Sequence, residues 1–369
     1  MSDKSKHITV TLSVLVLIAA ISLLCLTHKS IAVSDSERRP LAQMPDYSAD
    51  KLLSGNYFSS FESYSVDQFP FRDAFRSLKA FMHTSLLGRN DNNGYYEANG
   101  YLGKIDYPLN EESLSHAIDR IQYIYDTYFD GGNHNVYYSV IPDKSYFLAG
   151  STGRPFMDYQ KLTQSMETRL DTLMTYVDIF DSLTIEDYYK TDTHWRQDRL
   201  ENVVQTLGNA MGIRHQLLEA YTVRELYPFY GVYSGQSALP SDPESIYYLT
   251  NNILENCTVY NTETGKTGSI YDLDRFDSQD PYEVFLAGSQ AILTIQNPAN
   301  TSGDRLILFR DSFGSSIAPL LADAYSEIIL IDIRYVSSAL LDRFLTLSGD
   351  EDVLFLYSTL VLNNSSALK

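Results

Sequence analysis

Three apolar runs near the end of the chain constrain its fold most strongly. They are Arg305–Arg310 (RLILFR), Ile328–Ile333 (IILIDI) and Val353–Tyr357 (VLFLY), and none alternates regularly between apolar and polar residues. A strand without alternation is buried on both faces, as in parallel sheets that are covered by crossover helices. The intervening segments, Ser315–Ala324 and Ser337–Leu347, have the length of such helices. The sequence therefore predicts an α/β fold with a mostly parallel sheet flanked by helices.

The same alternation of helix and strand begins at about residue 110. Helical spacing of apolar residues and short apolar runs predict, in order, a helix over Glu111–Phe129, a strand over Val136–Pro142, a helix over Tyr159–Tyr176, a strand over Val177–Leu183 and a helix over Trp195–Met211. Between about 222 and 300 the sequence is rich in Pro, Gly, Tyr and Asp. We interpret that stretch as a long, β-rich insertion in the same domain.

Residues 29–109 have a different character. Lys29–Gln43 is polar and unpatterned, which is typical of a tether. Helical patterns follow from Ser48 to Phe61 and from Phe71 to Leu87, and two Asn-Gly pairs between Asn93 and Leu102 predict a hairpin. We therefore expect a stub and anchor at 1–28, a tether, helical lead-in and hairpin at 29–109, and one α/β domain at 110–369 with its insertion at about 222–300.

The N-terminal segment fixes the expected compartment. Ile8–Thr27 runs for 20 positions without a charge, and at about 1.5 Å per residue this matches a hydrocarbon core of roughly 30 Å. Lys4 and Lys6 precede it, so the positive-inside rule keeps the N-terminus in the cytoplasm and exports everything after His28. A cleaved signal peptide, with Ala32–Ser34 as its small-residue site, is the alternative and would make the protein secreted. We expect a single-pass transmembrane helix with an extracytoplasmic domain.

Charge and cysteine content exclude several classes of protein. The chain has 28 Lys and Arg against 47 Asp and Glu, a formal charge of −19, and the part after residue 28 carries −20. A chain this acidic lacks the basic surface that neutralises phosphates, so we expect no nucleic-acid partner. Cys25 and Cys257 lie far apart, with no zinc-type spacing. We therefore expect no metal and no cofactor.

The first candidate for chemistry is the segment Leu306–Ser316, an apolar strand that runs into a Gly- and Ser-containing turn. In open α/β sheets ligands bind at the carboxyl ends of strands. Ser312 at this turn would expose its hydroxyl there, and the N–H groups of Ser312, Phe313 or Gly314 would stabilise an oxyanion. The alternative is that Asp311 or Ser312 only caps the following helix.

The second candidate is Tyr188–Trp195 (YYKTDTHW). A histidine that acts as general base for a serine needs a carboxylate to hold its other ring nitrogen. Asp192 and His194 are two residues apart, so on an extended segment they point to the same side. The alternative is a solvated loop or a helix start capped by Asp192 or Thr193.

Together, the two segments resemble the DHHW and alginate O-acetyltransferase-like group, a branch of the SGNH hydrolase-like proteins. In that group the Asp-x-His-Trp motif precedes the Asp-Ser-Phe motif, the reverse of the order in ordinary SGNH esterases. Thr193 stands where the family name implies His, and the alginate enzymes are similar to this sequence there. The remaining points of resemblance are the N-terminal anchor, Glu37–Ala42, Asp67–Arg72, Gly100–Leu102 and Ile141–Lys144.

The resemblance implies an SGNH hydrolase-like fold with Ser312 as nucleophile, His194 as general base and then acid, and Asp192 as its orienting carboxylate. It further implies an O-acetyltransferase of the cell envelope that works through an acetyl-serine. Its acceptor would be a cell-surface or secreted polysaccharide (exopolysaccharide), and its partner a multi-span membrane O-acyltransferase that supplies acetyl groups.

Four further residues are candidate substrate contacts because of their positions. Lys144 follows one strand, Arg334 and Tyr335 follow another, and Trp195 lies beside the Asp-x-His motif, where it shapes an acceptor pocket or belongs to the core.

Two other functions stay open at this point. A carbohydrate acetyl esterase would use the same three residues with water as acceptor, and a non-catalytic polysaccharide assembly or binding component would use none of them. The negative charge of the exported part favours a neutral or amino-sugar acceptor over a polyuronate, although salt screens charges beyond about 8 Å.

Overall fold

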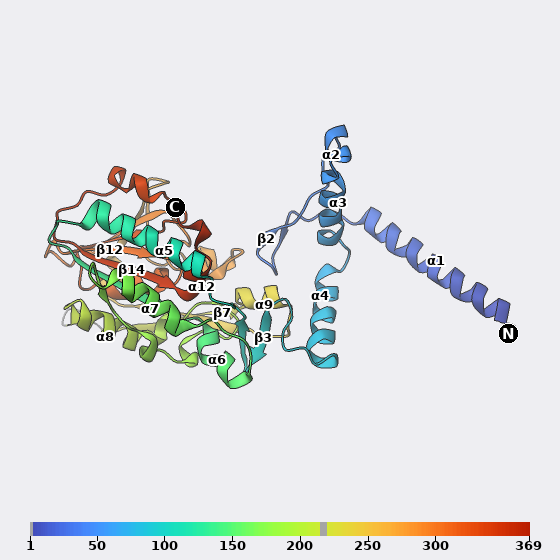
Figure 1. Ribbon diagram of the computed structural model, residues 1–369, viewed down its shortest axis with the longest axis horizontal. Helices are drawn as coiled ribbons and strands as arrows, with labels where there is room; N and C mark the ends of the chain where they lie inside the picture. Colours follow the sequence, from blue (N-terminus) through green and yellow to red (C-terminus); the bar gives the residue numbers. More distant parts are fainter. Residues whose placement is uncertain (1–2, 215–219) are drawn as a thin grey trace. The chain divides into compact units, whose positions relative to one another are not determined.

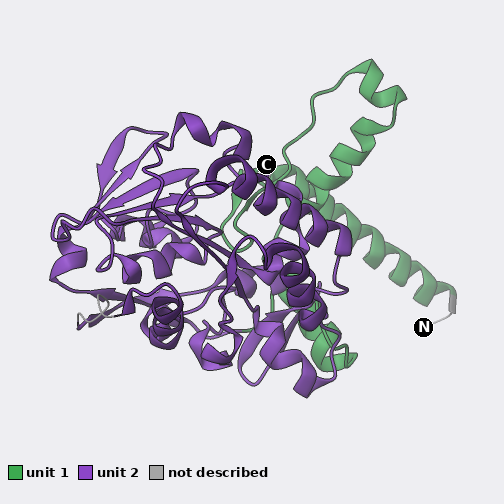
Figure 2. Cartoon of the chain, turned by 60° about the vertical axis from the view of Figure 1, so that its left-hand side comes forward, with its two compact units in different colours: residues 1–92, 238–240 green, residues 93–237, 241–369 purple. Residues whose placement is uncertain are grey.

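The computed structural model describes residues 3–214 and 220–369 (Figure 1). The chain divides into two compact units: unit 1 comprises residues 1–92 and 238–240, and unit 2 comprises 93–237 and 241–369 (Figure 2). The predicted organisation into anchor, lead-in and α/β domain stays a prediction, and residues 1 and 2 of the predicted stub lie outside the described residues.

Unit 2 is built around an eight-stranded sheet in the order β10-β9-β11-β13-β12-β14-β5-β6. The pairings from β13 through β12, β14 and β5 to β6 are parallel, and those of β10, β9 and β11 up to β13 are antiparallel. The predicted α/β fold with a mostly parallel sheet is therefore confirmed. The strands are β5 Asn135–Ile141, β6 Thr175–Tyr176, β9 Thr258–Asn261, β10 Lys266–Gly268, β11 Ile292–Gln296, β12 Arg305–Arg310, β13 Glu327–Ile331 and β14 Asp352–Ser358.

Both faces of this sheet are buried, which explains the missing alternation in its strands. In β12, Leu306 and Leu308 belong to one hydrophobic cluster, while Ile307 and Phe309 belong to another on the opposite face. Helices α8 and α11 contribute to the first cluster, and α5 and α7 to the second. The helices of unit 2 are α5 Glu111–Ile124, α6 Lys144–Thr152, α7 Tyr159–Leu170, α8 Glu201–Ala210, α9 Val232–Ser237, α10 Asn252–Asn256, α11 Gly314–Leu321 and α12 Thr359–Asn363.

Several predicted elements differ in the structure. The helix expected over Tyr159–Tyr176 ends at Leu170, because Thr175 and Tyr176 pair as β6, and Ser337–Leu347 contains the 3₁₀ helix Ser338–Arg343 in place of an α-helix. The strand expected over Val177–Leu183 is absent, because pairing ends near Tyr176 and Asp178 Oδ1 accepts a hydrogen bond from the Phe180 N–H at 2.9 Å, which turns the chain into a 3₁₀ helix. The helix expected from Trp195 begins only at Glu201, because Trp195 pairs with Tyr188 in an isolated antiparallel bridge.

The stretch predicted as an insertion is β-rich. It contains the antiparallel pair β7 Thr222–Phe229 and β8 Glu244–Thr250, and its strands β9, β10 and β11 extend the main sheet. The predicted hairpin also forms, from β3 Tyr95–Ala98 and β4 Tyr101–Lys104, with Asn99 and Gly100 at positive φ in its turn.

Unit 1 begins with α1 Asp3–Thr27, whose residues from Lys4 onward form a helix long and apolar enough to cross a membrane. After it come the short paired strands β1 Val33–Ser34 and β2 Arg39–Pro40. The predicted lead-in helices appear as α2 Ala49–Leu53, α3 Asn56–Asp67 and α4 Arg72–Phe81, which continues as a π-helical turn to Leu86.

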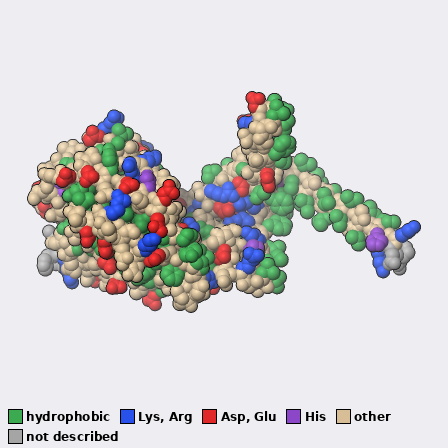
Figure 3. Space-filling model, viewed as in Figure 1, with side chains coloured by type: hydrophobic (Ala, Val, Ile, Leu, Met, Phe, Trp, Pro, Cys, Tyr) green, Lys and Arg blue, Asp and Glu red, His purple; other side chains and the backbone are tan. Residues whose placement is uncertain are grey.

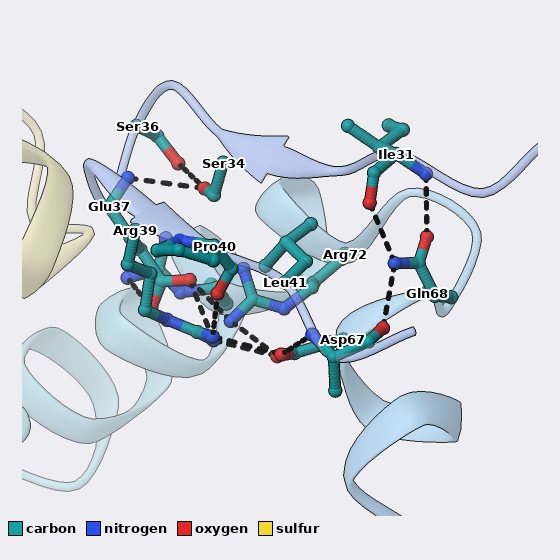
Figure 4. A network of polar contacts seen from close by, with 12 residues as sticks. Ile31, Ser34, Ser36, Glu37, Arg39, Pro40, Leu41, Asp67, Gln68 and Arg72 are labelled. Atoms are coloured by element: carbon teal, nitrogen blue, oxygen red, sulfur yellow. Dashed lines mark hydrogen bonds and ion pairs between the residues drawn. The ribbon is translucent and has the colours of Figure 1, made fainter. Parts of the chain in front are cut away.

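The segment predicted as a tether is fastened to these helices by polar contacts (Figure 4). Arg39 donates two hydrogen bonds to the Asp67 carboxylate at 2.7 and 2.9 Å, and the Ala42 N–H donates to the same carboxylate at 2.9 Å. The Gln68 amide accepts from the Ile31 N–H at 2.9 Å and donates to the Ile31 carbonyl at 2.8 Å. The chain after α1 is therefore held against the end of α3.

We expect Asp67→Asn to loosen this segment. The hydrogen bonds from Arg39 hold the pKa of Asp67 at about 2, below its ordinary value. The stabilisation that the Asp67 carboxylate contributes is thus fully present above the ordinary aspartate pKa of about 4, and it is lost as the pH falls toward 2. At pH 6, amide exchange over residues 29–43 should be on the order of tenfold faster in Asp67→Asn than in wild type, and the difference should shrink at pH 2.5. Asp46→Asn, at an exposed position, is the control. Equal exchange rates in wild type, Asp67→Asn and Asp46→Asn would show that Asp67 does not hold residues 29–43 in place.

Candidate active site

The Asp-x-His motif lies on a tight loop, Tyr188–Trp195, which we call the histidine loop. Tyr188 and Trp195 pair across its base, and the Tyr189 N–H donates to the His194 carbonyl at 3.1 Å. The Asp192 carboxylate closes the loop from inside, because its Oδ1 accepts from the His194 backbone N–H at 3.1 Å and lies 2.6 Å from His194 Nδ1. The segment is a loop instead of the extended chain that we expected, and the side chains of Asp192 and His194 still meet.

The serine turn follows β12. Asp311 shapes it: Oδ1 accepts from the Phe313 N–H at 3.0 Å, and Oδ2 accepts from the Ser358 N–H at the end of β14 at 2.8 Å. Helix α11 then begins at Gly314, where a side chain would collide with the Arg310 stem. The turn leaves Ser312 partly exposed at the carboxyl end of the strand.

The structure brings the three predicted catalytic side chains together. His194 Nε2 lies 2.7 Å from Ser312 Oγ, and His194 Nδ1 lies 2.6 Å from Asp192 Oδ1. Asp192 and His194 are buried, at 0% and 6% exposure. With a proton on Nδ1, the free Nε2 can accept the serine proton, and the buried carboxylate can stabilise the imidazolium that forms. This arrangement suits nucleophilic attack by Ser312 on a carbonyl carbon.

Two of the three backbone N–H groups that were predicted to bind the oxyanion already donate hydrogen bonds within the protein. The Phe313 N–H donates to the Asp311 carboxylate, and the Gly314 N–H donates to the Asp311 carbonyl at 3.0 Å. In the part of the chain that the structure describes, the Ser312 N–H donates to no other group. The geometry thus favours Ser312 as an oxyanion donor over Phe313 and Gly314.

Lys144 is placed behind the loop and is only 2% exposed. Its Nζ donates to the carbonyls of Tyr189 and Lys190 at 3.0 and 3.1 Å and lies 4.9 Å from the centre of the Tyr233 ring. Burial lowers the pKa of Lys144 to about 7. These contacts favour a positioning role for Lys144 over the predicted contact with substrate.

Trp195 is fully buried, which favours the core over the acceptor pocket. Its Nε1–H donates to Ser316 Oγ at 2.9 Å and to the Phe313 carbonyl at 3.2 Å, so it links the histidine loop to the serine turn.

Arg334 and Tyr335 follow β13 and make no contact with Ser312, His194 or Asp192 among the interactions of the described residues. Arg334 is paired with Asp332 at 2.6 and 2.9 Å, while the Tyr335 ring is half exposed. Contact of Arg334 and Tyr335 with substrate stays a prediction.

The insertion holds the histidine loop, which the sequence did not indicate. The Val232 N–H donates to Asp192 Oδ2 at 2.7 Å, and the Gly231 N–H donates to Thr191 Oγ1 at 2.8 Å. From β8, the Glu244 carboxylate accepts from the N–H groups of Lys190 and Thr191 at 2.9 and 2.7 Å. Both Asp192 oxygens therefore accept defined hydrogen bonds.

Tyr282, also in the insertion, was missed as well. Its ring lies flat on the His194 imidazole, with centroids 3.8 Å apart and planes 4° apart. Its hydroxyl donates to Ser316 Oγ at 2.9 Å, and the side chain is buried. The stack restricts rotation of the imidazole out of the line between Asp192 and Ser312, so we interpret Tyr282 as a positioning residue.

We expect Tyr282→Leu to lower kcat for acetyl-ester turnover by about 3- to 10-fold, the value of one aromatic pair, with little change in KM. Tyr282→Phe keeps the ring and should retain most of the rate. Nitrogen NMR of His194 should show a single tautomer in wild type and Tyr282→Phe, and a mixture in Tyr282→Leu. Tyr260→Leu, at a half-exposed tyrosine of β9, is the matched control. Equal rates in the Phe and Leu variants would refute the positioning role.

The described residues contain no group of three or more His, Cys, Asp or Glu side chains arranged to hold a metal ion.

Comparisons with known proteins agree with the fold. The family model described as DHHW protein matches residues 164–331, which include Asp192, His194 and Ser312. A DHHW family protein from Eubacterium siraeum is similar in structure, with a TM-score of 0.56 and 21% identity over 75% of this chain and 95% of that chain. No curated protein sequence matches the chain.

Two further solved structures are similar. PatB1 from Bacillus cereus, solved with a sulfonyl adduct, has a TM-score of 0.54 and 19% identity over 73% of this chain and 95% of that chain. The O-acetyltransferase domain of Pseudomonas putida AlgJ has a TM-score of 0.45 and 12% identity over 74% of this chain and 93% of that chain. At 19% identity the likeness to PatB1 concerns the fold alone.

The structure defines an α/β protein with a mostly parallel sheet, in which the histidine loop precedes the serine turn along the chain. The DHHW family model matches residues 164–331 of the chain, and the resemblance seen in the sequence is confirmed.

Proposed function

We propose that this protein is an extracytoplasmic O-acetyltransferase that acetylates hydroxyls of a cell-surface or secreted polysaccharide through an acetyl-Ser312 intermediate. The observation that carries the proposal is the line of contacts from Ser312 Oγ through the His194 ring to the buried Asp192 carboxylate, at 2.7 and 2.6 Å. A buried carboxylate that meets a histidine behind a turn serine is the arrangement that activates a serine nucleophile.

In the first half-reaction, Ser312 Oγ attacks the carbonyl carbon of an acetyl donor and gives its proton to His194 Nε2. The Ser312 N–H donates to the oxyanion of the tetrahedral intermediate in this scheme, which the lack of another acceptor for it among the described residues supports. As that intermediate collapses, the bond to the donor oxygen breaks and His194 returns the proton to the leaving group. The products are acetyl-Ser312 and the free donor alcohol.

In the second half-reaction, a sugar hydroxyl attacks the acetyl-serine carbonyl and passes its proton to His194. Cleavage of the bond to Ser312 Oγ then restores the serine with that proton and releases the acetylated sugar. Throughout, Asp192 holds the proton on Nδ1 and stabilises the imidazolium. Water in place of the sugar hydroxyl would give hydrolysis, so acceptor access decides between transferase and esterase.

The helix α1 supports a site that works at a membrane, with a multi-span membrane O-acyltransferase as the supplier of acetyl groups. The formal charge of −19 supports a neutral or amino-sugar acceptor, because a polyuronate would be repelled at low ionic strength.

The test is the partition of products from an activated acetyl ester offered to the full chain in detergent, with neutral, amino-sugar or uronate oligosaccharides as acceptors. We expect acetylated oligosaccharide with the first two acceptors and none from Ser312→Ala. Acetate alone at every acceptor concentration would favour the esterase. Turnover that is unchanged in Ser312→Ala, or absent in wild type, would overturn the proposal and favour a non-catalytic role.

A further inference from the structure

Large apolar side chains are exposed along α3 and α4 in unit 1. In Figure 3, hydrophobic side chains cover α1 and gather again over the lead-in helices. We define the apolar face by six residues that are each 41% to 69% exposed: Phe58, Phe61, Phe75, Leu78, Phe81 and Leu86. Single exposed apolar residues are normal on a protein surface, whereas a contiguous set marks a surface that contacts something apolar.

Helix α4 is amphipathic with its apolar side outward. Its charged side faces the rest of unit 1, because Arg72 and Arg76 pair with Glu37 at 2.5 and 3.2 Å and Ala80 is fully buried. Phe75 and Leu78 project from the opposite side and are half exposed. The charged side is thus occupied within unit 1, and the apolar side is available to bind.

Covalent connection places this face near the end of α1. Helix α1 ends at Thr27, and Ile31 is bonded through both its N–H and its carbonyl to the Gln68 side chain, between α3 and α4. Four extended residues reach at most about 14 Å. Ile31 therefore lies within that distance of the end of α1, and the Gln68 side chain at the junction of α3 and α4 is bonded directly to it.

The charge of this region suits a membrane surface. Residues 28–92 contain eight Lys or Arg and eight Asp or Glu, so they are neutral, while the whole chain carries −19. The negative charge therefore lies in the rest of the chain, and the apolar face meets no net repulsion from anionic lipids.

We propose that the apolar face of α3 and α4 inserts into the lipid interface beside α1. An amphipathic helix in this position sinks its apolar side about 5–10 Å into the boundary between headgroups and acyl chains. The lead-in is then a second membrane contact that fixes the helices flat on the bilayer. The inference rests on the anchoring part of the proposed function, because it needs α1 in the membrane.

The test uses tryptophan quenching by brominated acyl chains, with the full chain reconstituted in phosphatidylcholine vesicles. The chain has one Trp, the fully buried Trp195, which supplies a constant background. Leu78→Trp and Phe61→Trp report on the apolar face, and Leu17→Trp reports on α1. Ser63→Trp is the matched control, since Ser63 is exposed on α3 and points away from Phe58 and Phe61.

We expect Leu78→Trp, Phe61→Trp and Leu17→Trp to lose most of the added emission in brominated vesicles, and Ser63→Trp and wild type to keep theirs. If Leu17→Trp is quenched but Leu78→Trp and Phe61→Trp behave like Ser63→Trp, the inference is overturned while the anchor stands. Blue-shifted but unquenched emission at Leu78→Trp would assign the face to a protein partner or a second copy and would equally overturn it. No quenching of Leu17→Trp would remove the anchor and the inference together. The transferase assay on Ser312 is independent of all these results.

Discussion

Replacing Ser312 with alanine should lower kcat for acetyl-ester turnover by on the order of 10³-fold or more, because the variant has no atom that can accept the acetyl group. The kcat of His194→Ala should fall by a similar factor, since His194 Nε2 is the proton acceptor 2.7 Å from Ser312 Oγ. The double variant should be little slower than either single variant, because the residues act as one unit.

Steady-state rates at saturating ester, together with thermal unfolding of each variant, check this expectation. Ser337→Ala serves as the matched control. It removes a partly buried hydroxyl in the same unit, and that hydroxyl makes no capping hydrogen bond to the 3₁₀ helix that follows. Retention of wild-type turnover by a folded Ser312→Ala variant would remove Ser312 from the mechanism. Multiplicative losses in the double variant would mean that Ser312 and His194 act in separate steps.

The second large effect should come from Gly231→Ala. A Cβ at position 231 would overlap the backbone of Thr191 and Asp192, and backbone atoms cannot move aside as the end of a side chain can. The histidine loop would shift, and a displacement of about 1 Å at a reacting group costs on the order of 10²-fold in rate. We expect that loss in kcat, although position 231 contacts neither Ser312 nor His194 directly.

Gly150→Ala is the control for this substitution, because a Cβ there meets nothing within 4 Å in helix α6. It should leave the rate unchanged and stabilise the protein slightly, by up to about 1 kcal/mol. Full activity of Gly231→Ala would show that the loop tolerates displacement and that the insertion does not position Asp192.

The sequence predicted the sheet, and the three side chains that it proposed for catalysis lie together in the structure. The continuous apolar runs of β12, β13 and β14 have one physical cause, burial on both faces, so they predicted parallel strands. Ser312 and His194 each follow local patterns, a strand-to-helix turn and an Asp-x-His pair, and the structure brings them within 2.7 Å.

What the sequence could not predict depends on contacts between distant segments. Val232 and Tyr282 are 40 and 88 positions from Asp192 and His194, and no local pattern indicates that the insertion folds over the loop. The burial of Lys144 depends in the same way on the carbonyls of Tyr189 and Lys190, 45 and 46 positions away. The pairing of Arg39 with Asp67 was not predicted for the same reason, because the two residues are 28 positions apart.

The helix boundaries show a related effect. Apolar spacing predicted a helix from Trp195, but the bridge to Tyr188 and the hydrogen bonds of the indole keep Trp195 out of a helix. The 3₁₀ helix Gln197–Arg199 follows, and the α-helix begins at Glu201. Tertiary packing overrides local propensity where the loop must present His194 to Ser312.

The most direct test of the proposed mechanism is rapid-quench mass spectrometry of the full chain mixed with an activated acetyl ester. We expect a mass gain of one acetyl group, mapped to the peptide that contains Ser312, which forms before free product and disappears when an oligosaccharide acceptor is added. His194→Ala should form it far more slowly and Ser312→Ala not at all. Turnover by wild type without an acetylated enzyme, or with the acetyl group on another residue, would contradict the account.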